Sequence, residues 1–238
     1  MERTHPAPGR PLLAGPARPW AATLLVGCAV LVAVLGVLFA HQTTADRLDQ
    51  AVDTPVVGWL GGHPSLAVWL AFPGSLIPAV AFSAAIIGAC LLAGRRNGAV
   101  LAAVAVPAAA GLTDGLFKHL VDRTYLGVLS YPSGHTASVF ALVATVAVLL
   151  LPAPQLTATE TLRPLRGLLT GLACGVGIVV AIGVMGLRWH YFTDTVADAA
   201  VGIGTVCGLA FLLDLPLARR SLGRVRLRAP TAQPKARV

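Results

Sequence analysis

Six long runs of apolar, uncharged residues constrain this chain more than any other feature of the sequence. Each run approaches the roughly 20 residues that an α-helix needs to cross a bilayer. Because lipid offers no partner to free backbone N–H and C=O groups, each run is either a helix or a strand of a closed barrel. The runs lack the alternation of barrel strands, so we predict an all-α, polytopic membrane protein with six transmembrane helices. They cover about residues 20–40, 76–93 (with 66–72 as a lead-in), 98–120, 136–151, 168–187 and 191–213.

Charge is scarce in this chain and unevenly placed. Only 12% of the residues are charged, against roughly 25% in soluble domains. If the N-terminus is cytoplasmic, 14 of the 18 Lys and Arg residues lie in cytoplasmic segments, as the positive-inside rule requires. The net charge of +8 therefore indicates membrane orientation and no nucleic-acid partner. We expect a cytoplasmic tail over 1–19, a membrane domain over 20–214, and a basic, disordered cytoplasmic tail over 215–238 that touches anionic lipid.

Ionisable residues gather at three places on the side predicted to be extracytoplasmic. An ionisable group at membrane depth costs about 2.5 to 3.5 kcal/mol on insertion scales, so such groups mark functional sites by default. The topology places the end of the third run, the start of the fourth and the turn between the fifth and sixth on one face. This agreement predicts a single site on that face. Its members are Asp114, Lys118, His119, Asp122 and Arg123 in the first cluster, His135 in the second, and Arg188, His190, Asp194 and Asp198 in the third.

The first cluster offers cations to an anionic head group. Lys118 and Arg123 lie where the third helix leaves the membrane, and an arginine presents a planar fork that suits phosphate oxygens. Two simpler interpretations stay open. Both side chains could extend to the interface without a ligand, or Asp114 could neutralise Lys118 one helical turn away.

The second cluster is the stretch YPSGHTA, residues 131–137, which opens the fourth apolar run. Pro132 and Ser133 are typical of a helix start, and a plain cap explains both. Gly134 lets the backbone approach a bulky group, and the free N–H groups of a helix start bind anions. A cap does not explain His135, which is suited to protonate a departing oxygen.

In the third cluster, His190 and Asp194 are one helical turn apart. A carboxylate at that spacing can hold one imidazole nitrogen and make the other a better nucleophile. The simpler alternative is an i,i+4 pair that caps the last helix. Arg188 precedes this pair, and Asp198 continues the same helix face without an assigned role.

Together these residues resemble the type 2 phosphatidic acid phosphatase superfamily, whose soluble relatives include the vanadium haloperoxidases. The family pattern is a Lys with Arg-Pro seven residues later, then PSGH, then an Arg six residues before His-x-x-x-Asp. The resemblance spans residues 118–202, and PSGH followed about 50 residues later by His-x-x-x-Asp is its specific part. The resemblance implies catalysis by positioned side chains, with no metal and no cofactor.

The resemblance also implies a role for each matching residue. His190 would attack phosphorus to form a phosphohistidine, and Asp194 would orient it. His135 would protonate the leaving group and later activate water. The implied phosphate ligands are Lys118 and the main-chain donors at Ser133 and Gly134.

The chain departs from the family pattern at three positions. Tyr125 stands seven residues after the lysine, and Val184 stands six residues before the nucleophile. Either Arg123 and Arg188 replace the two missing cations from displaced positions, or the pocket holds a smaller anionic group, or activity is weak. Asp198 stands where the family commonly has Gly.

We therefore predict a lipid phosphatase that acts at the outer face of the cell membrane on a phosphate monoester or pyrophosphate. Candidate substrates are phosphatidic acid, phosphatidylglycerol phosphate, and polyprenyl phosphate or diphosphate. The competing hypothesis is a non-catalytic relative that binds or transports an anionic lipid head group. The shifted arginines favour that hypothesis, and the intact histidine pair disfavours it. An intramembrane serine protease fits less well, because Ser133 suits a cap and lacks a Gly-x-Ser-Gly context.

Overall fold

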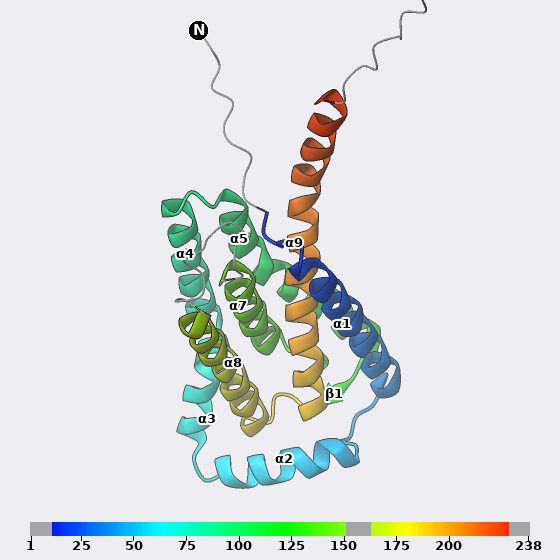
Figure 1. The fold of residues 1–238 in the computed structure, drawn as a ribbon. Helices are drawn as coiled ribbons and strands as arrows, with labels where there is room; N and C mark the ends of the chain where they lie inside the picture. Colours follow the sequence, from blue (N-terminus) through cyan, green and yellow to red (C-terminus); the bar gives the residue numbers. More distant parts are fainter. Residues whose placement is uncertain (1–10, 151–162, 229–238) are drawn as a thin grey trace, which may run out of the picture.

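The computed structural model describes residues 11–150 and 163–228, which form a bundle of long helices (Figure 1). A short antiparallel pair, β1 with β2, is the strand structure in these residues. The elements in order are α1 (Ala17–Phe39), α2 (Arg47–Leu60), α3 (Pro64–Ala71), η1 (Phe72–Gly74), α4 (Leu76–Leu92), α5 (Arg96–Ala110), the π-helix η2 (Gly111–Phe117), α6 (Lys118–Val121), β1 (Thr124–Tyr125), β2 (Val128–Leu129), α7 (Gly134–Leu150), α8 (Arg163–Gly186) and α9 (Phe192–Arg228).

The helices are those of a multi-pass membrane protein. In the described part of the chain, five helical segments are long and apolar enough to cross a bilayer. The remaining predicted run is α7, which is apolar but has only 17 residues. The predicted helical membrane class is therefore confirmed. The five segments are Ala17–Phe39, Pro64–Leu92, Arg96–Val121, Pro164–Gly186 and Phe192–Leu215.

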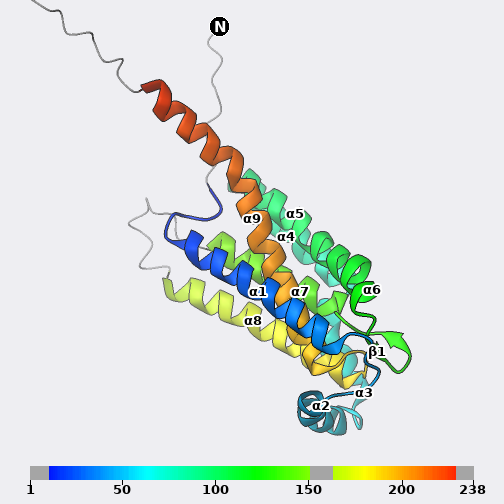
Figure 2. The ribbon, with the colours of Figure 1, turned by 90° about the vertical axis from the view of Figure 1, so that its right-hand side faces the viewer.

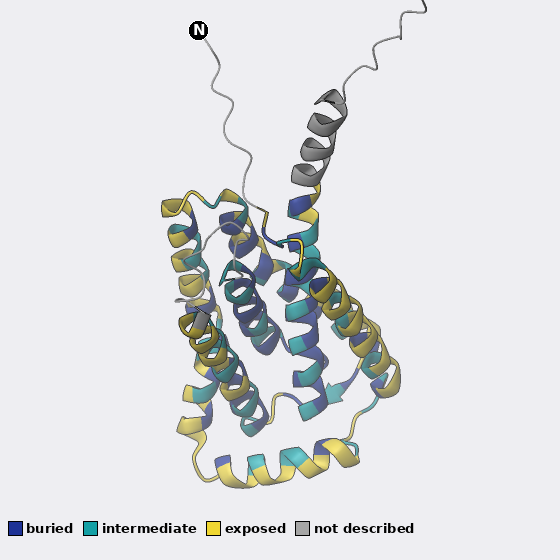
Figure 3. Ribbon diagram, viewed as in Figure 1, coloured by how far each residue is buried: buried dark blue, intermediate teal, exposed yellow. Residues whose placement is uncertain are grey.

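Burial separates the inner helices from the outer ones. α7 packs against α5, α8 and α9, and its buried residues lie around most of its circumference. The outer helices α1, α4 and α8 instead expose large apolar side chains such as Val37, Leu92 and Leu172 (Figure 3). Apolar surface on this scale needs a non-aqueous partner, which for these helices is lipid.

A glycine brings the two central helices together. A Cβ on Gly202 of α9 would lie 2.5 Å from the carbonyl oxygen of Ala137 and 2.8 Å from the amide of Ala141, both in α7. Only glycine allows the two backbones to approach so closely. Because α7 carries His135 and α9 follows His190, this contact helps to set the distance between the two halves of the site.

Two elements differ from the sequence-based expectation. α2 was not predicted, and it lies across one end of the bundle (Figures 1 and 2). The backbone of α9 remains helical to Arg228, beyond the expected end of the span near residue 213. Leu and Arg are good helix formers and are frequent in this extension. Residues 1–10 and 229–238 of the two predicted tails lie outside the described residues.

Candidate active site

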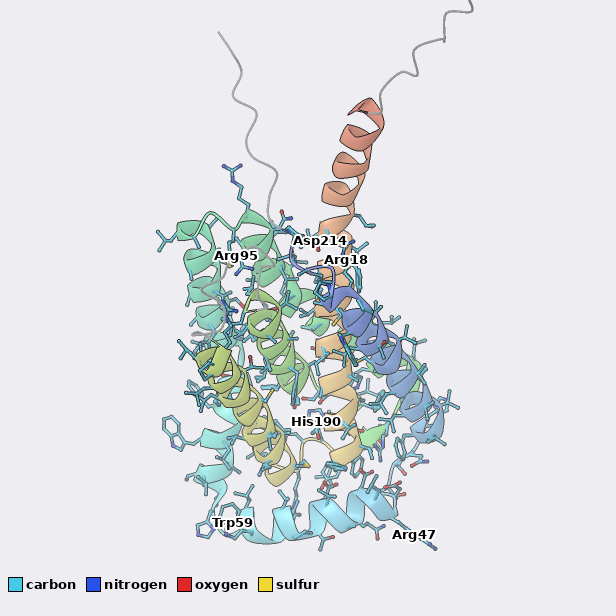
Figure 4. All side chains as sticks on the ribbon, viewed as in Figure 1. Arg18, Arg47, Trp59, Arg95, His190 and Asp214 are labelled. Atoms are coloured by element: carbon cyan, nitrogen blue, oxygen red, sulfur yellow. The ribbon has the colours of Figure 1, made fainter. Side chains whose placement is uncertain are left out.

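Residues from all three predicted clusters line one cavity of about 1440 Å³. Lys118 comes from α6, His135 from the first turn of α7, and His190 from the turn between α8 and α9. Figure 4 shows His190 between the ends of α8 and α9, toward the end of the bundle that α2 covers. The structure thus brings together side chains that are far apart in the sequence.

The cavity has a polar end and an apolar wall. The polar end holds the two histidines and Lys118, together with Arg188 and the start of α7. The wall follows α4 and α5, and several of its side chains are also exposed on the outer surface of the bundle. The cavity therefore joins a charged site to the lipid-facing surface. Wall residues include Leu76, Val80, Ile87, Val106 and Pro107.

The imidazole of His190 is buried and held in one tautomer. Its Nδ1 lies 2.6 Å from the backbone carbonyl oxygen of Ser130. A carbonyl can only accept, so Nδ1 carries the proton and Nε2 keeps a free lone pair. Burial lowers the pKa of His190 to about 4, so the ring is neutral at pH 7. A neutral imidazole with a free Nε2 can act as a nucleophile.

Asp194 was expected to hydrogen-bond to His190, but it bonds to Arg123 and Tyr191 instead. Its Oδ1 accepts a hydrogen bond from Arg123 Nη1 at 2.6 Å, and its Oδ2 accepts one from the backbone N–H of Tyr191 at 3.1 Å. Among the hydrogen bonds of the described residues, the ring of His190 is held by Ser130 and not by Asp194. Asp194 therefore supports the turn that carries His190 rather than the imidazole itself.

Arg123 lies away from the cavity, although the sequence had suggested it as a phosphate ligand. Its side chain is 0% exposed, and its Nη2 lies 2.5 Å from Asp49 Oδ2 on α2. The guanidinium is stacked between the rings of Phe39 and Tyr191, at 4.3 Å and 4.2 Å from their centroids. Arg123 also pairs with Asp194, so its guanidinium bridges the two buried carboxylates of Asp49 and Asp194. In this way Arg123 joins α2 to the start of α9.

Sequence reasoning missed the carboxylates of α2. Asp49 accepts the backbone N–H of Thr193 at 2.9 Å, and Asp53 accepts that of Phe192 at 3.1 Å. These two side chains satisfy N–H groups in the first turn of α9, as a local cap otherwise does. Burial, and then the charge of Asp49, raises the pKa of Asp53 to about 7. The i,i+4 spacing of Asp49 and Asp53 was the signal available in the sequence. It does not identify their partners, which lie about 140 residues away in the chain.

The PSGH loop keeps fewer free donors than expected. The backbone N–H of Ser133 donates to Asp198 Oδ1, and Asp198 is fully buried. The hydroxyl of Ser133 is buried and has no hydrogen-bond partner among the described residues. Hence the main-chain donor predicted at Ser133 is already engaged, and Gly134 is where the α7 backbone borders the cavity.

Lys118 and Arg188 supply the positive charge of the cavity. Lys118 Nζ lies 2.7 Å from Asp114 Oδ1, and both side chains line the cavity. Arg188 lies on the exposed turn after α8 and has a left-handed backbone with φ 58°. Tyr125, at the position of a missing family arginine, also lines the cavity. Lys118 and Arg188 are therefore placed to contact an anion, whereas Arg123 is not.

Comparisons with known proteins agree with the resemblance. Residues 117–216 match the model of the PAP2 superfamily. The fold is similar to the crystal structure of the first transmembrane PAP2 type phosphatidylglycerolphosphate phosphatase from Bacillus subtilis, with a TM-score of 0.57, 17% sequence identity, and coverage of 89% of this chain and 98% of that one. No curated protein matches the sequence significantly. The predicted resemblance to PAP2 proteins is confirmed, and the fold is that of a membrane PAP2 phosphatase.

Proposed function

We propose that this chain is a metal-independent lipid phosphate or lipid pyrophosphate phosphatase that acts at the outer face of the membrane through a phosphohistidine intermediate. The carrying observation is the state of His190, whose Nδ1 donates to the carbonyl of Ser130 and leaves Nε2 free. His135 and Lys118 line the same cavity. A nucleophile, a proton donor and a cation around one space are the groups that phosphoryl transfer through a covalent histidine intermediate uses.

The proposed reaction has two steps. In the first, the lone pair of His190 Nε2 attacks phosphorus while the bond from phosphorus to the leaving oxygen breaks, and His135 gives that oxygen a proton. In the second, His135 takes a proton from water, whose oxygen attacks phosphorus and breaks the bond to nitrogen. Inorganic phosphate leaves and both histidines return to their starting states. Lys118 and Arg188 balance the charge on the phosphoryl oxygens.

The apolar wall of the cavity supports a lipid substrate. A phosphate at the polar end would leave its hydrocarbon portion along α4 and α5, where the wall side chains are partly exposed to the surrounding lipid. Phosphatidic acid, phosphatidylglycerol phosphate and polyprenyl phosphate or diphosphate all have this shape. The structural neighbour is by name a phosphatidylglycerolphosphate phosphatase, which favours that member of the set.

The topology is part of this proposal. α7 would be a sixth, shorter span, since it is apolar and mostly enclosed by α5, α8 and α9. Six spans put both termini on the same side of the membrane. The positive-inside rule makes that side cytoplasmic, so the cavity would lie on the extracytoplasmic side. A membrane-impermeant thiol reagent should label Arg47→Cys, in α2, on intact cells. Protection of that cysteine until the membrane is opened would reverse the orientation.

Phosphate release from a panel of lipid phosphates tests the activity. Detergent-solubilised protein in EDTA should release inorganic phosphate, and His190→Ala should lower kcat by at least about 10³-fold because the nucleophile is lost. His119→Ala is the matched control, since His119 is exposed and does not line the cavity. Undiminished release by His190→Ala would remove this residue from the proposed role.

A binding or transport protein remains the second candidate. The engaged N–H of Ser133 and the missing family arginines favour it, because both reduce the charge stabilisation available to a transition state. Saturable binding of the lipid panel without phosphate release, in protein that retains its native melting profile, would support this candidate over the phosphatase.

A further inference from the structure

Asp114 lies where the proposed phosphatase would hold phosphate. Its Oδ1 is 2.7 Å from Lys118 Nζ. A Cβ built on Gly134 would lie 2.6 Å from Asp114 Oδ2, and the next two nearest atoms belong to the same carboxyl group. The carboxylate therefore sits between the cavity lysine and the first residue of α7. Two features predicted to bind phosphate thus face a negative group of the protein itself.

A simple surface ion pair does not account for this position. An i,i+4 pair on a helix contributes only about 0.3 to 0.5 kcal/mol and needs no contact with a second helix. The carboxyl group of Asp114 instead lies against Gly134 of the PSGH loop, and both residues line the cavity. Asp114 lies in the π-helical segment Gly111–Phe117, and such segments are frequent at functional sites. Its side chain is 53% exposed, so packing leaves it free to move.

The charge of the cavity shows what this carboxylate does to an incoming anion. Lys118 and Arg188 are the Lys and Arg residues that line it in the described part of the chain, while His190 is neutral at pH 7. A phosphate monoester brings a charge of about −1.5 to −2 near neutral pH. Held by Lys118, it would lie beside Asp114, and like charges at such distances repel. Binding therefore requires that the carboxylate move away.

We propose that Asp114 is a built-in competitor for the phosphate position and sets how tightly the site holds phosphate. In the empty site it neutralises Lys118; the lipid phosphate displaces it, and it returns as inorganic phosphate leaves. The identity of the anion rests on the proposed function. Asp114 then weakens binding of the product and favours its release.

Calorimetric titration of inorganic phosphate into the full-length protein in detergent tests the proposal. Asp114→Asn keeps the shape of the side chain but removes its charge, so the Kd for phosphate should fall about tenfold at pH 7. Asp122→Asn is the matched control. Asp122 is an exposed carboxylate near the same end of the bundle that pairs with His41 and does not line the cavity. Its Kd should equal that of the unaltered protein.

The direction of the change separates competition from a structural role. If Asp114 merely supported Lys118, its loss would weaken phosphate binding, and an unchanged or higher Kd for Asp114→Asn overturns the proposal. An equal tightening in Asp122→Asn also overturns it, because the effect would then be general. Asp114→Ala should tighten binding as well, and it serves if the asparagine variant does not fold.

A parallel assay of lipid phosphate hydrolysis keeps the two proposals apart. Tighter phosphate binding by Asp114→Asn in a protein that hydrolyses no lipid phosphate would remove the phosphatase and leave the competitor in place. If the unaltered protein hydrolyses lipid phosphate but Asp114→Asn binds phosphate no more tightly, the phosphatase proposal stands and the competitor proposal is overturned. If both proposals hold, the inhibition constant of inorganic phosphate in lipid phosphate hydrolysis should be about tenfold lower for Asp114→Asn than for the unaltered protein.

Discussion

Lys118 and Arg123 are separated by five positions in the chain and lie at the same end of the bundle, yet they do different things. Arg123 is fully buried between two carboxylates and two aromatic rings. Lys118 is 23% exposed, lines the cavity and pairs with the exposed carboxylate of Asp114. The comparison teaches that surroundings, more than residue type, separate a structural cation from one available to a ligand.

The physical basis of this difference is desolvation. A buried ion pair is strongly destabilising to break, because the charge left behind has neither water nor a partner. A pair at the edge of a cavity keeps access to water, so either member can exchange its partner at little cost. Arg123 therefore maintains the arrangement of α2 and α9, while Lys118 remains available to an anion.

Removing the buried cation should have the largest effect. Arg123→Met leaves Asp49 and Asp194 without their shared partner, and we expect the free energy of unfolding to fall by about 3 to 5 kcal/mol. SDS-induced unfolding in mixed micelles measures it. Arg47→Met is the matched control, because Arg47 is an exposed arginine on α2. Native stability in Arg123→Met would contradict the structural role given to this residue.

Removing the cavity cation should instead affect activity. Lys118→Met should lower kcat/KM for a lipid phosphate by about 10² to 10³-fold, as the loss of one charge-stabilising group at a transition state does. Its free energy of unfolding should change by no more than about 0.5 kcal/mol. The two quantities, measured on one preparation, sharpen the contrast with Arg123. Equal activity of Lys118→Met and the unaltered protein would contradict the role given to Lys118 in this contrast.

Asp53, which lies on α2, should make the free energy of unfolding depend on pH. Burial raises the pKa of Asp53 to about 7 from 3.8, so the native state retains a proton that the unfolded chain loses. The contribution is present below about pH 4 and is lost as the pH rises through 7. For a half-buried carboxyl we expect about 1 kcal/mol after solvent screening. Asp53→Asn should remove this slope between pH 4.5 and 7.5, and an unaltered slope would assign it to another group.

The smallest effect is expected at Arg188, the exposed cation of the cavity. Arg188→Ala should raise KM for a lipid phosphate about threefold, because an exposed charge contributes less than about 1 kcal/mol to an interaction. Its kcat and stability should stay near those of the unaltered protein. Steady-state kinetics across the lipid panel gives these values. A loss as large as that of Lys118→Met would show that Arg188 replaces a missing family arginine fully.

Much of the site was accessible from the sequence because its chemistry lies in short, local patterns. His135 follows a helix-start signal, Lys118 ends an apolar run, and His190 lies in a turn between two runs; all three line one cavity. The span pattern was equally readable, since a bilayer imposes length and polarity on each segment.

The partners of these residues were not accessible in the same way. Sequence spacing suggested that Asp194 holds His190, but the structure uses the carbonyl of Ser130, which carries no sequence signal. Asp49 and Asp53 contact the start of α9 from a helix that hydropathy did not predict. Such contacts depend on the approach of distant segments, which spacing within one segment does not encode.

By itself, the sequence determined that this chain forms apolar helices suited to a membrane, and that histidines, a lysine and a PSGH loop lie at their ends, because these properties follow from local composition and spacing. Tertiary structure alone decided which charges are buried and which remain available. Arg123 is buried because helices from distant parts of the chain enclose it. The same helices leave Asp114 beside the cavity, where it faces Gly134. Burial fixes the energy of a charge, and burial is a property of the assembled fold.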